Sequence, residues 1–257
     1  MIKRVLRITL LALLLVACEQ DNLVIHEPQA EVEITFNFDY ENVDMTRAIS
    51  DGTQVDELMY AIFNAENNQL VISKSTKKNA SGATSTSGLT THMTLSGGVK
   101  YKAVFWMQSS LTDAYTVSED MKVTVSYAGE CNDETRDAFY GVSPEFTIDD
   151  SSVGVILRRP FAQLNVGAYP FDWEYIQEFY DFDITTSCIR IRDVAHTIDL
   201  TTGELSNRGS ASFKPGALPT ESLKADVDED GVSEDYTYVA MAYLLADSTP
   251  TTHSADF

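Results

Sequence analysis

The sequence predicts an all-β protein built from β-sandwiches, and three features predict it. Short stretches alternate between apolar and polar residues, which is typical of half-buried strands. Turn residues such as Gly97-Gly98 and Pro215-Gly216 separate these stretches. Residues 173–182 could form a short helix, but their apolar residues are nearly continuous, so periodicity leaves that assignment open. Many short strands with little helix favour a sandwich.

The first eighteen residues are predicted to be a targeting signal. Basic residues precede an apolar run at 8–17, which is shorter than the roughly 20 residues that cross a bilayer and fits a signal-peptide core. The run ends at Ala17-Cys18 and resembles the bacterial lipoprotein box, which implies cleavage after Ala17 and lipid on Cys18. The alternative is an ordinary signal peptide with a chance Cys. We predict a signal peptide at 1–17 and contact with the membrane through the lipid alone.

The acidic stretch at 19–22 resembles the signal that sends lipoproteins of the Bacteroides group to the outer face of the outer membrane. A polar, lipidated tether is predicted at 18–30, and the first strand follows at 32–38, where apolar residues alternate with polar ones. Further strands are predicted at 58–63, 70–72, 89–95, 101–107, 121–127, 153–157, 161–166, 188–191 and 236–245. Residues 74–91, rich in Ser, Thr and Gly, are predicted to be a flexible hairpin connection.

A boundary between two sandwiches is predicted at Arg158-Arg159-Pro160, because Pro cannot donate to a strand ladder. The N-terminal sandwich would span 31–159. The C-terminal one would span 160–257, and it is short enough to be incomplete.

The charge and the motifs exclude several classes of function. The formal charge of −21 repels a phosphate backbone, so no nucleic-acid partner is expected. The sequence has no H-E-x-x-H, C-x-x-C, G-x-S-x-G or phosphate-binding glycine loop, so we predict no enzyme activity and no cofactor. Cys131 and Cys188 are expected to be unpaired, partly buried thiols, although a single bridge between them stays open.

One segment weakly matches a metal site. Asp226, Asp228 and Asp230, followed by Gly231, match the start of a calcium loop, where oxygens at positions one, three and five converge on the ion. The acid expected at position twelve is replaced by Thr237. We favour the alternative of a solvated acidic turn, so the predicted metal set is none, with these three Asp as weak calcium candidates.

Four segments and the lipoprotein box together resemble the fimbrillin-like surface lipoproteins of the Bacteroides group. The segments read VDELMYAIF at 55–63, KYKAVFWMQ at 100–108, RDAFY at 136–140 and LRRPFAQLNV at 157–166. Their order and spacing carry the resemblance over residues 32–245. The resemblance implies two tandem transthyretin-like Greek-key β-sandwiches, an outer-membrane lipid anchor and a role as fimbrial subunit or adhesin.

The resemblance also implies assembly by donor-strand exchange. A trypsin-like protease cuts after an Arg near the first strand, and the vacated groove accepts a strand from a neighbouring subunit. The matching segment, MTRAI at 45–49, makes Arg47 the candidate processing site, with an ordinary solvated Arg as the alternative. Residues 247–257 are polar, contain Pro250 and would be a poor donor, which favours an anchor, tip or solitary adhesin over a stalk subunit.

The predicted function is therefore a fimbrillin-type lipoprotein on the cell surface, anchored in the outer membrane or part of a fimbrium. Its expected partners are other fimbrial subunits and a host or bacterial surface ligand. The alternative is a surface glycan-binding lipoprotein associated with a nutrient transporter. That function needs exposed aromatic side chains, for which Trp173 is a better candidate than Trp106 in its dense apolar strand, although packing is favoured for both.

Overall fold

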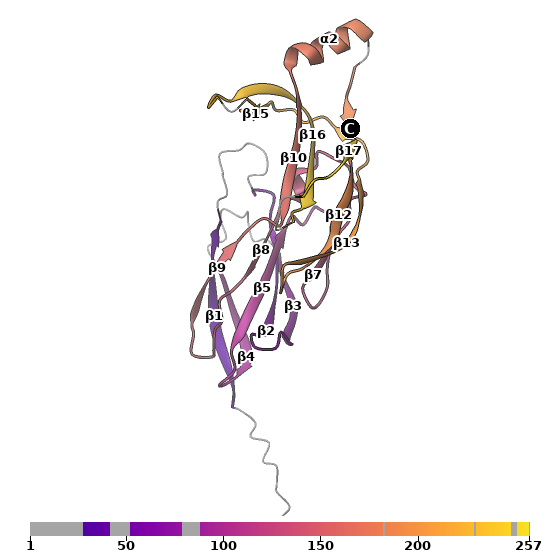
Figure 1. Ribbon diagram of the computed structural model, residues 1–257. Coiled ribbons are helices and arrows are strands. Elements are labelled where there is room, and N and C mark those ends of the chain that lie inside the picture. Colours follow the sequence, from indigo (N-terminus) through magenta and orange to yellow (C-terminus); the bar gives the residue numbers. More distant parts are fainter. Residues whose placement is uncertain are drawn as a thin grey trace, which may run out of the picture.

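The computed structural model describes residues 28–41, 52–78, 88–181, 183–228, 230–247 and 251–256. Most of them lie in strands, so the predicted all-β class is confirmed (Figure 1). The elements in chain order are β1 (Gln29–Tyr40), β2 (Glu57–Asn64), β3 (Leu70–Lys78), β4 (Leu89–Ser96), β5 (Tyr101–Gln108), β6 (Tyr115–Val117), β7 (Lys122–Val125), the 3₁₀ turn η1 (Glu134–Arg136), β8 (Ala138–Val142), β9 (Ser152–Leu157), β10 (Phe161–Ala168), α2 (Pro170–Tyr180), β11 (Thr186–Ser187), β12 (Arg190–Asp199), β13 (Glu204–Ser212), β14 (Gly216–Ala217), β15 (Leu223–Ala225), β16 (Glu234–Leu245) and β17 (Ala255–Asp256).

A central sheet with the order β3-β2-β5-β8 is covered on both faces. Along β5, Phe105 and Met107 belong to one cluster of buried residues, and Val104 and Trp106 belong to another. Side chains of a strand alternate between the two faces, so each face of β5 serves a different core. Burial of both faces explains why the sequence of β5 is densely apolar rather than alternating.

The first core lies between the central sheet and a sheet with the order β4-β1-β9. We define it by its buried residues: Ile34, Phe36, Val55, Leu58, Tyr60, Ile62, Leu89, Met93, Leu95, Tyr101, Ala103, Phe105, Met107, Phe139, Phe146, Val153, Val155 and Leu157. The inward residues predicted for the first strand fall here, because Ile34 and Phe36 are buried and Val32 and Phe38 pack against the cluster.

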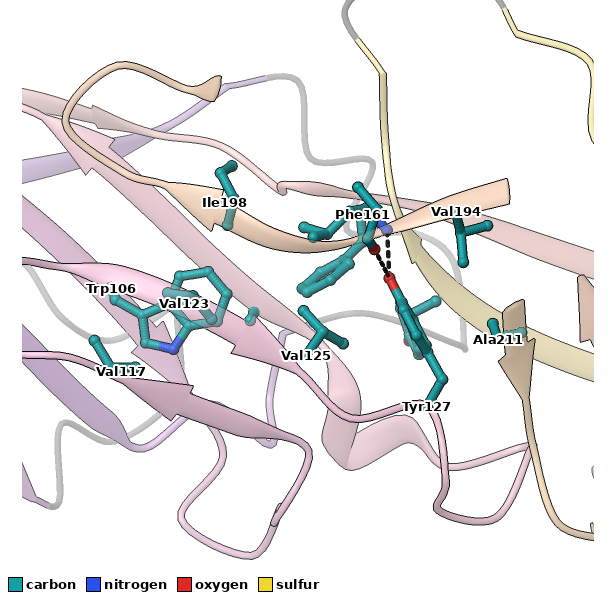
Figure 2. Packing of buried hydrophobic residues seen from close by; sticks show 14 of the residues in the cluster. Trp106, Val117, Val123, Val125, Tyr127, Phe161, Val194, Ile198 and Ala211 are labelled. Atoms are coloured by element: carbon teal, nitrogen blue, oxygen red, sulfur yellow. Dashed lines mark hydrogen bonds between the residues drawn. The ribbon is translucent and has the colours of Figure 1, made fainter. Parts of the chain in front are cut away.

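The second core lies on the other face of the central sheet and combines strands from distant parts of the chain. It is covered by β10-β16-β15 and by a sheet with the order β13-β12-β7-β6. In that sheet Thr124 of β7 pairs with Thr197 of β12. Figure 2 shows part of this core, including Trp106, Val123 and Ile198. The sheet thus takes strands from both sides of the predicted boundary at 159/160, and the division into two domains stays a prediction.

Several strand predictions are confirmed, and a few elements differ. The strand predicted at 188–191 begins only at Arg190, and β3 continues to Lys78, so residues 74–78 are strand rather than loop. Residues 89–91 at the other end of the predicted loop are also strand, because they begin β4, and residues 79–87 lie outside the described residues. Strand β13 has the sequence ELSNRGSAS, whose polar residues gave no strand signal; its pairing with β12 makes it a strand.

The stretch left open at 173–182 contains most of helix α2. Pro170 stands in its first turn, where a missing N–H costs nothing, and Asp181 ends it in the left-handed conformation with φ of 51°. Figure 1 shows α2 at one end of the elongated molecule and the start of β1 toward the opposite end. Among the described residues, no helix combines the length and apolar character needed to cross a bilayer.

Candidate functional site

Strand β1 occupies the middle of its sheet, between β4 and β9. Its first part pairs antiparallel with β4, from Gln29 opposite Ser96 to Phe36 opposite Leu89. Its last part pairs in parallel with β9, from Thr35 to Tyr40. Because β1 hydrogen-bonds to both neighbours, its departure would leave unpaired N–H and C=O groups on two strands that face a common gap.

The inward side chains of β1 fit between aromatic rings of the first core. The Phe36 ring lies 5.1 Å from the Phe105 ring and 5.6 Å from the Phe146 ring, both edge to face. The Phe38 ring also lies 5.1 Å from the Phe105 ring, and the Tyr40 ring lies 5.3 Å from the Phe139 ring. These contacts need large apolar side chains at alternate positions and little else from the strand.

The outward side chains of β1 form polar contacts with the neighbouring strands. Glu33 Oε2 lies 3.0 Å from His92 Nε2, and the hydroxyls of Thr35 and Thr90 are 2.9 Å apart. His92 is an exposed strand residue, as the sequence predicts. Such exposed pairs contribute little stability, so β1 is retained mainly by its backbone bonds and its buried side chains.

The sequence-predicted processing and lipid residues lie outside the described part of the chain. Ala17 and Cys18 precede residue 28, and Arg47 falls in the gap at 42–51. The description of the first segment ends at Glu41, whose carboxylate lies 3.3 Å from the guanidinium of Arg158. The assignments of Ala17, Cys18 and Arg47 therefore stay predictions.

A buried ion pair stabilises the passage from β9 to β10. Arg159 donates from Nε and Nη2 to the two carboxylate oxygens of Asp137, each at 2.8 Å. The guanidinium also lies 4.7 Å from the centre of the Phe139 ring. Asp137 is 1% exposed, so a paired guanidinium is needed to offset the removal of its charge from water.

The buried tyrosines of the second core act as structural hydrogen-bond partners. The Tyr127 hydroxyl donates to the carbonyl of Ala195 at 2.9 Å and accepts the N–H of Leu245 at 3.2 Å, joining β12 to β16 (Figure 2). Burial raises the pKa of Tyr127 to about 12 and that of Tyr115 well above its usual value. Both hydroxyls therefore stay protonated at neutral pH and are not general bases.

The three candidate calcium ligands are brought together at the surface. One carboxylate oxygen from each of Asp226, Asp228 and Asp230 lies within 4.8 Å of the others, and all three residues are exposed. Asp226 accepts the N–H of Asp230 at 3.1 Å and that of Gly231 at 2.8 Å. Thr237 is paired in β16 with Ala168 of β10. Calcium binding stays a prediction, which calorimetric titration at millimolar calcium would test.

The two Cys of the described chain are both free thiols, but they differ in exposure. Cys131 is buried and donates to the carbonyl of Ser187 at 2.7 Å, whereas Cys188 is exposed. The expectation of unpaired thiols is confirmed, and partial burial is wrong for Cys188. Cys188 lies just before β12, and the neighbouring Ile189 is the residue whose side chain is buried there. The side chain of Cys188 is therefore left in solvent.

The two Trp also differ. Trp106 is 0% exposed and packs edge to face on Tyr115 and Phe161, so its predicted core position is confirmed. Trp173 is half-buried on α2. Sequence analysis missed the exposed aromatic residues on the same helix, at positions 171, 175 and 179. Their spacing of four residues is the signal that could have indicated them.

Comparison with known proteins finds one matching family and several similar structures. Residues 26–257 match the model described as "Family of unknown function (DUF6562)". No curated protein matches the sequence.

The similar solved structures include the fimbrial anchor protein Mfa2 from Porphyromonas gingivalis. It is 12% identical, with 88% of this chain and 76% of that chain covered and a TM-score of 0.48. A candidate adhesin from Bacteroides ovatus is 12% identical, with 92% and 74% covered and a TM-score of 0.41. A fimbrial assembly protein from Parabacteroides distasonis is 12% identical, with 83% and 88% covered and a TM-score of 0.36.

Proposed function

This chain belongs to the DUF6562 family, and we propose that it is a cell-surface protein of fimbrial type, acting as an anchor, tip or adhesin. The observation that carries the proposal is the position of β1 between β4 and β9. A middle strand held by alternating apolar side chains can be replaced by another strand with the same alternation. The sequence motifs of fimbrillin type support the same role.

The proposed exchange requires β1 to leave the sheet, and a disulfide across the sheet tests this. Glu33 and His92 are directly opposite in the β1–β4 ladder, so Glu33→Cys with His92→Cys would join the two strands. We expect the oxidised variant, made with Cys188→Ser to avoid wrong pairing, to be absent from fibres in electron micrographs. Reduction should restore assembly.

The matched control places the cysteines at Thr116 and Thr124, exposed residues that are directly opposite in the ladder between β6 and β7, in a different sheet from β1. That variant should assemble whether it is oxidised or reduced. Normal assembly of the oxidised β1–β4 variant would rule out exchange of this strand.

The proposed processing site is Arg47, which follows β1 in the sequence. N-terminal sequencing of protein shed from the surface should find a chain that begins at Ala48, and Arg47→Ala should abolish it. Arg158→Ala, which removes another exposed arginine, is the control. A mature chain that still begins at Cys18 would contradict processing.

The proposed anchor is a lipid on Cys18, with the signal peptide removed after Ala17. Cys18→Ser should move the protein from the membrane fraction to the soluble fraction, because acyl chains supply the attachment. Cys188→Ser is the matched control and should stay in the membrane fraction. Identical partition of Cys18→Ser and the parent would remove the anchor from the proposal.

The second candidate function is glycan binding next to a nutrient transporter. The observation that favours it is the set of exposed aromatic side chains on α2. Fibres in electron micrographs of cells that overproduce the protein would favour the fimbrial function. Glycan binding would be favoured if the cells form no fibres and the purified chain binds a soluble glycan in calorimetry.

A further inference from the structure

The outward face of α2 carries an exposed aromatic stripe, which we define as Phe171, Tyr175 and Phe179. Their exposed fractions are 77%, 53% and 64%. Residues four apart lie on one face of a helix, so the three rings form a single row. The half-buried residues of the helix, Trp173 and Gln177, fall on the opposite face, and the other exposed apolar residues, Ile176 and Tyr180, lie between the two faces.

From this stripe we propose that α2 is a docking helix that inserts into an apolar groove, with basic residues at its rim, on a different protein. The inference goes beyond the proposed function, because it assigns a contact surface on α2, which is separate from the position of β1 between β4 and β9. Large exposed apolar side chains gathered on one face are typical of interaction sites, and an amphipathic helix in a groove is a recurrent mode of recognition.

The rings of the stripe form one row along the helix. The Phe171 and Tyr175 rings are nearly parallel, with centroids 6.5 Å apart and an interplanar angle of 16°. The Tyr175 and Phe179 rings are nearly parallel at 5.4 Å and 20°. Large side chains spaced four residues apart on one face are the anchors with which an amphipathic helix fills an apolar groove.

The charge around the stripe determines the character of the partner. Asp172 lies beside the stripe on one side of the helix, and Glu174 and Glu178 lie on the other. No Lys, Arg or His occurs from residue 160 to residue 189. A second copy of this chain that docked through the same helix would place the same carboxylates against one another, and an anionic lipid surface would repel them. Lys or Arg side chains at the rim of a partner's groove would be attracted to these carboxylates.

The position of α2 makes the stripe accessible. The helix lies next to β16 without burying any of its own residues, and the ring of Tyr169 just before it lies 5.1 Å from that of Tyr236. Figure 1 shows the helix standing at the end of the molecule opposite to the first described residues. A partner can approach this end without disturbing either core.

Photo-crosslinking of the full chain tests the proposal. The photoreactive residue p-benzoylphenylalanine replaces Tyr175 in cells that produce the protein naturally, and the cells are irradiated. We expect one adduct with a different protein, and we expect its yield to fall about tenfold when Glu174→Lys and Glu178→Lys are added. An adduct with a second copy, a lipid or a glycan would overturn the proposal, as would the absence of an adduct.

The crosslinked protein is then purified and its affinity for the full chain is measured. Phe171→Gln with Tyr175→Gln and Phe179→Gln should raise Kd by at least about tenfold, because truncated aromatic anchors commonly cost that much. Leu111→Gln removes an equally exposed apolar side chain elsewhere and should leave Kd unchanged. All variants change exposed residues, so their melting temperatures should match the parent. Equal affinity of the triple variant and the parent would overturn the proposal.

Discussion

The two cores that share the central sheet combine the same two kinds of contact but join different parts of the chain. The first kind is the edge-to-face ring contact, found between Phe36 and Phe105 in the first core and between Trp106 and Phe161 in the second. The second kind is the polar anchor: the hydroxyls of Tyr60 and Thr91 are 2.8 Å apart in the first core, and the Tyr127 hydroxyl joins β12 to β16 in the second. The strands of the first core lie within residues 29–157, whereas those of the second reach residue 245. Aromatic contacts tolerate substitution by other apolar groups, whereas each polar anchor needs its own partner in place.

Arg136 illustrates the second kind of contact. Its guanidinium is 3% exposed, donates twice to the carbonyl of Ser126 at 3.0 Å and lies 5.2 Å from the Phe213 ring. A Cβ on Gly129 would lie 2.6 Å from Nη2 of this arginine, so a side chain there would force the guanidinium to move. The two cores therefore differ in connectivity: β1 lies between two strands of one sheet over the first core, whereas the second core depends on anchors between segments far apart in the chain.

The largest effect is expected from a direct comparison of the two cores. Trp106→Ala and Phe36→Ala each remove a fully buried ring and should lower the free energy of unfolding by about 3–5 kcal/mol. Denaturant unfolding measures both. Only Phe36→Ala should also make β1 accessible to proteases before global unfolding, because it loosens one strand of the first core. If β1 were equally protected from proteases in both variants, the two cores would not differ in how they hold β1.

A somewhat smaller effect is expected at the passage from β9 to β10. Arg159→Ala removes the guanidinium beside the buried carboxylate of Asp137 and should cost about 3 kcal/mol in denaturant unfolding. Adding Asp137→Asn should recover part of the loss, because the buried negative charge is then removed. A double variant no more stable than Arg159→Ala would show that the charge is not the cause.

The Tyr127 anchor should have a moderate effect that depends on pH. Tyr127→Phe loses two hydrogen bonds and should cost about 1–3 kcal/mol at pH 7. The pKa of Tyr127 is raised to about 12, so above pH 10 the unfolded chain loses this proton while the folded chain keeps it. The stability of the parent should therefore fall between pH 10 and 12 by roughly 2 kcal/mol more than that of the variant. Parallel pH curves would contradict this assignment.

The smallest effect is expected on the outer face of β1. Glu33→Gln removes an exposed contact with His92 and should change the free energy of unfolding by less than about 0.5 kcal/mol. Thermal unfolding at pH 7 is the measurement. A larger loss would mean that β1 is retained by its outer face as well as by its inner one.

Local patterns predicted the strands that have one polar and one apolar face. The alternation from Val32 to Phe38 indicated both β1 and its buried side, because the period of two is a property of the backbone itself. The polar strand β13 left no such signal, since its conformation comes from the ladder with β12. For the candidate site, the sequence predicted strand β1 and the grouping of the three Asp at 226–230. It did not predict the aromatic stripe of α2.

The sequence by itself determined the all-β class, the inward face of β1 and the position of the dense strand β5. Tertiary structure alone decided that β1 lies between β4 and a parallel β9, and that β7 joins β12 in one sheet. It also decided that the aromatic residues of α2 stay outside both cores. The physical reason is that strand alternation arises from neighbouring residues, whereas pairing partners and burial depend on contacts between segments far apart in the chain.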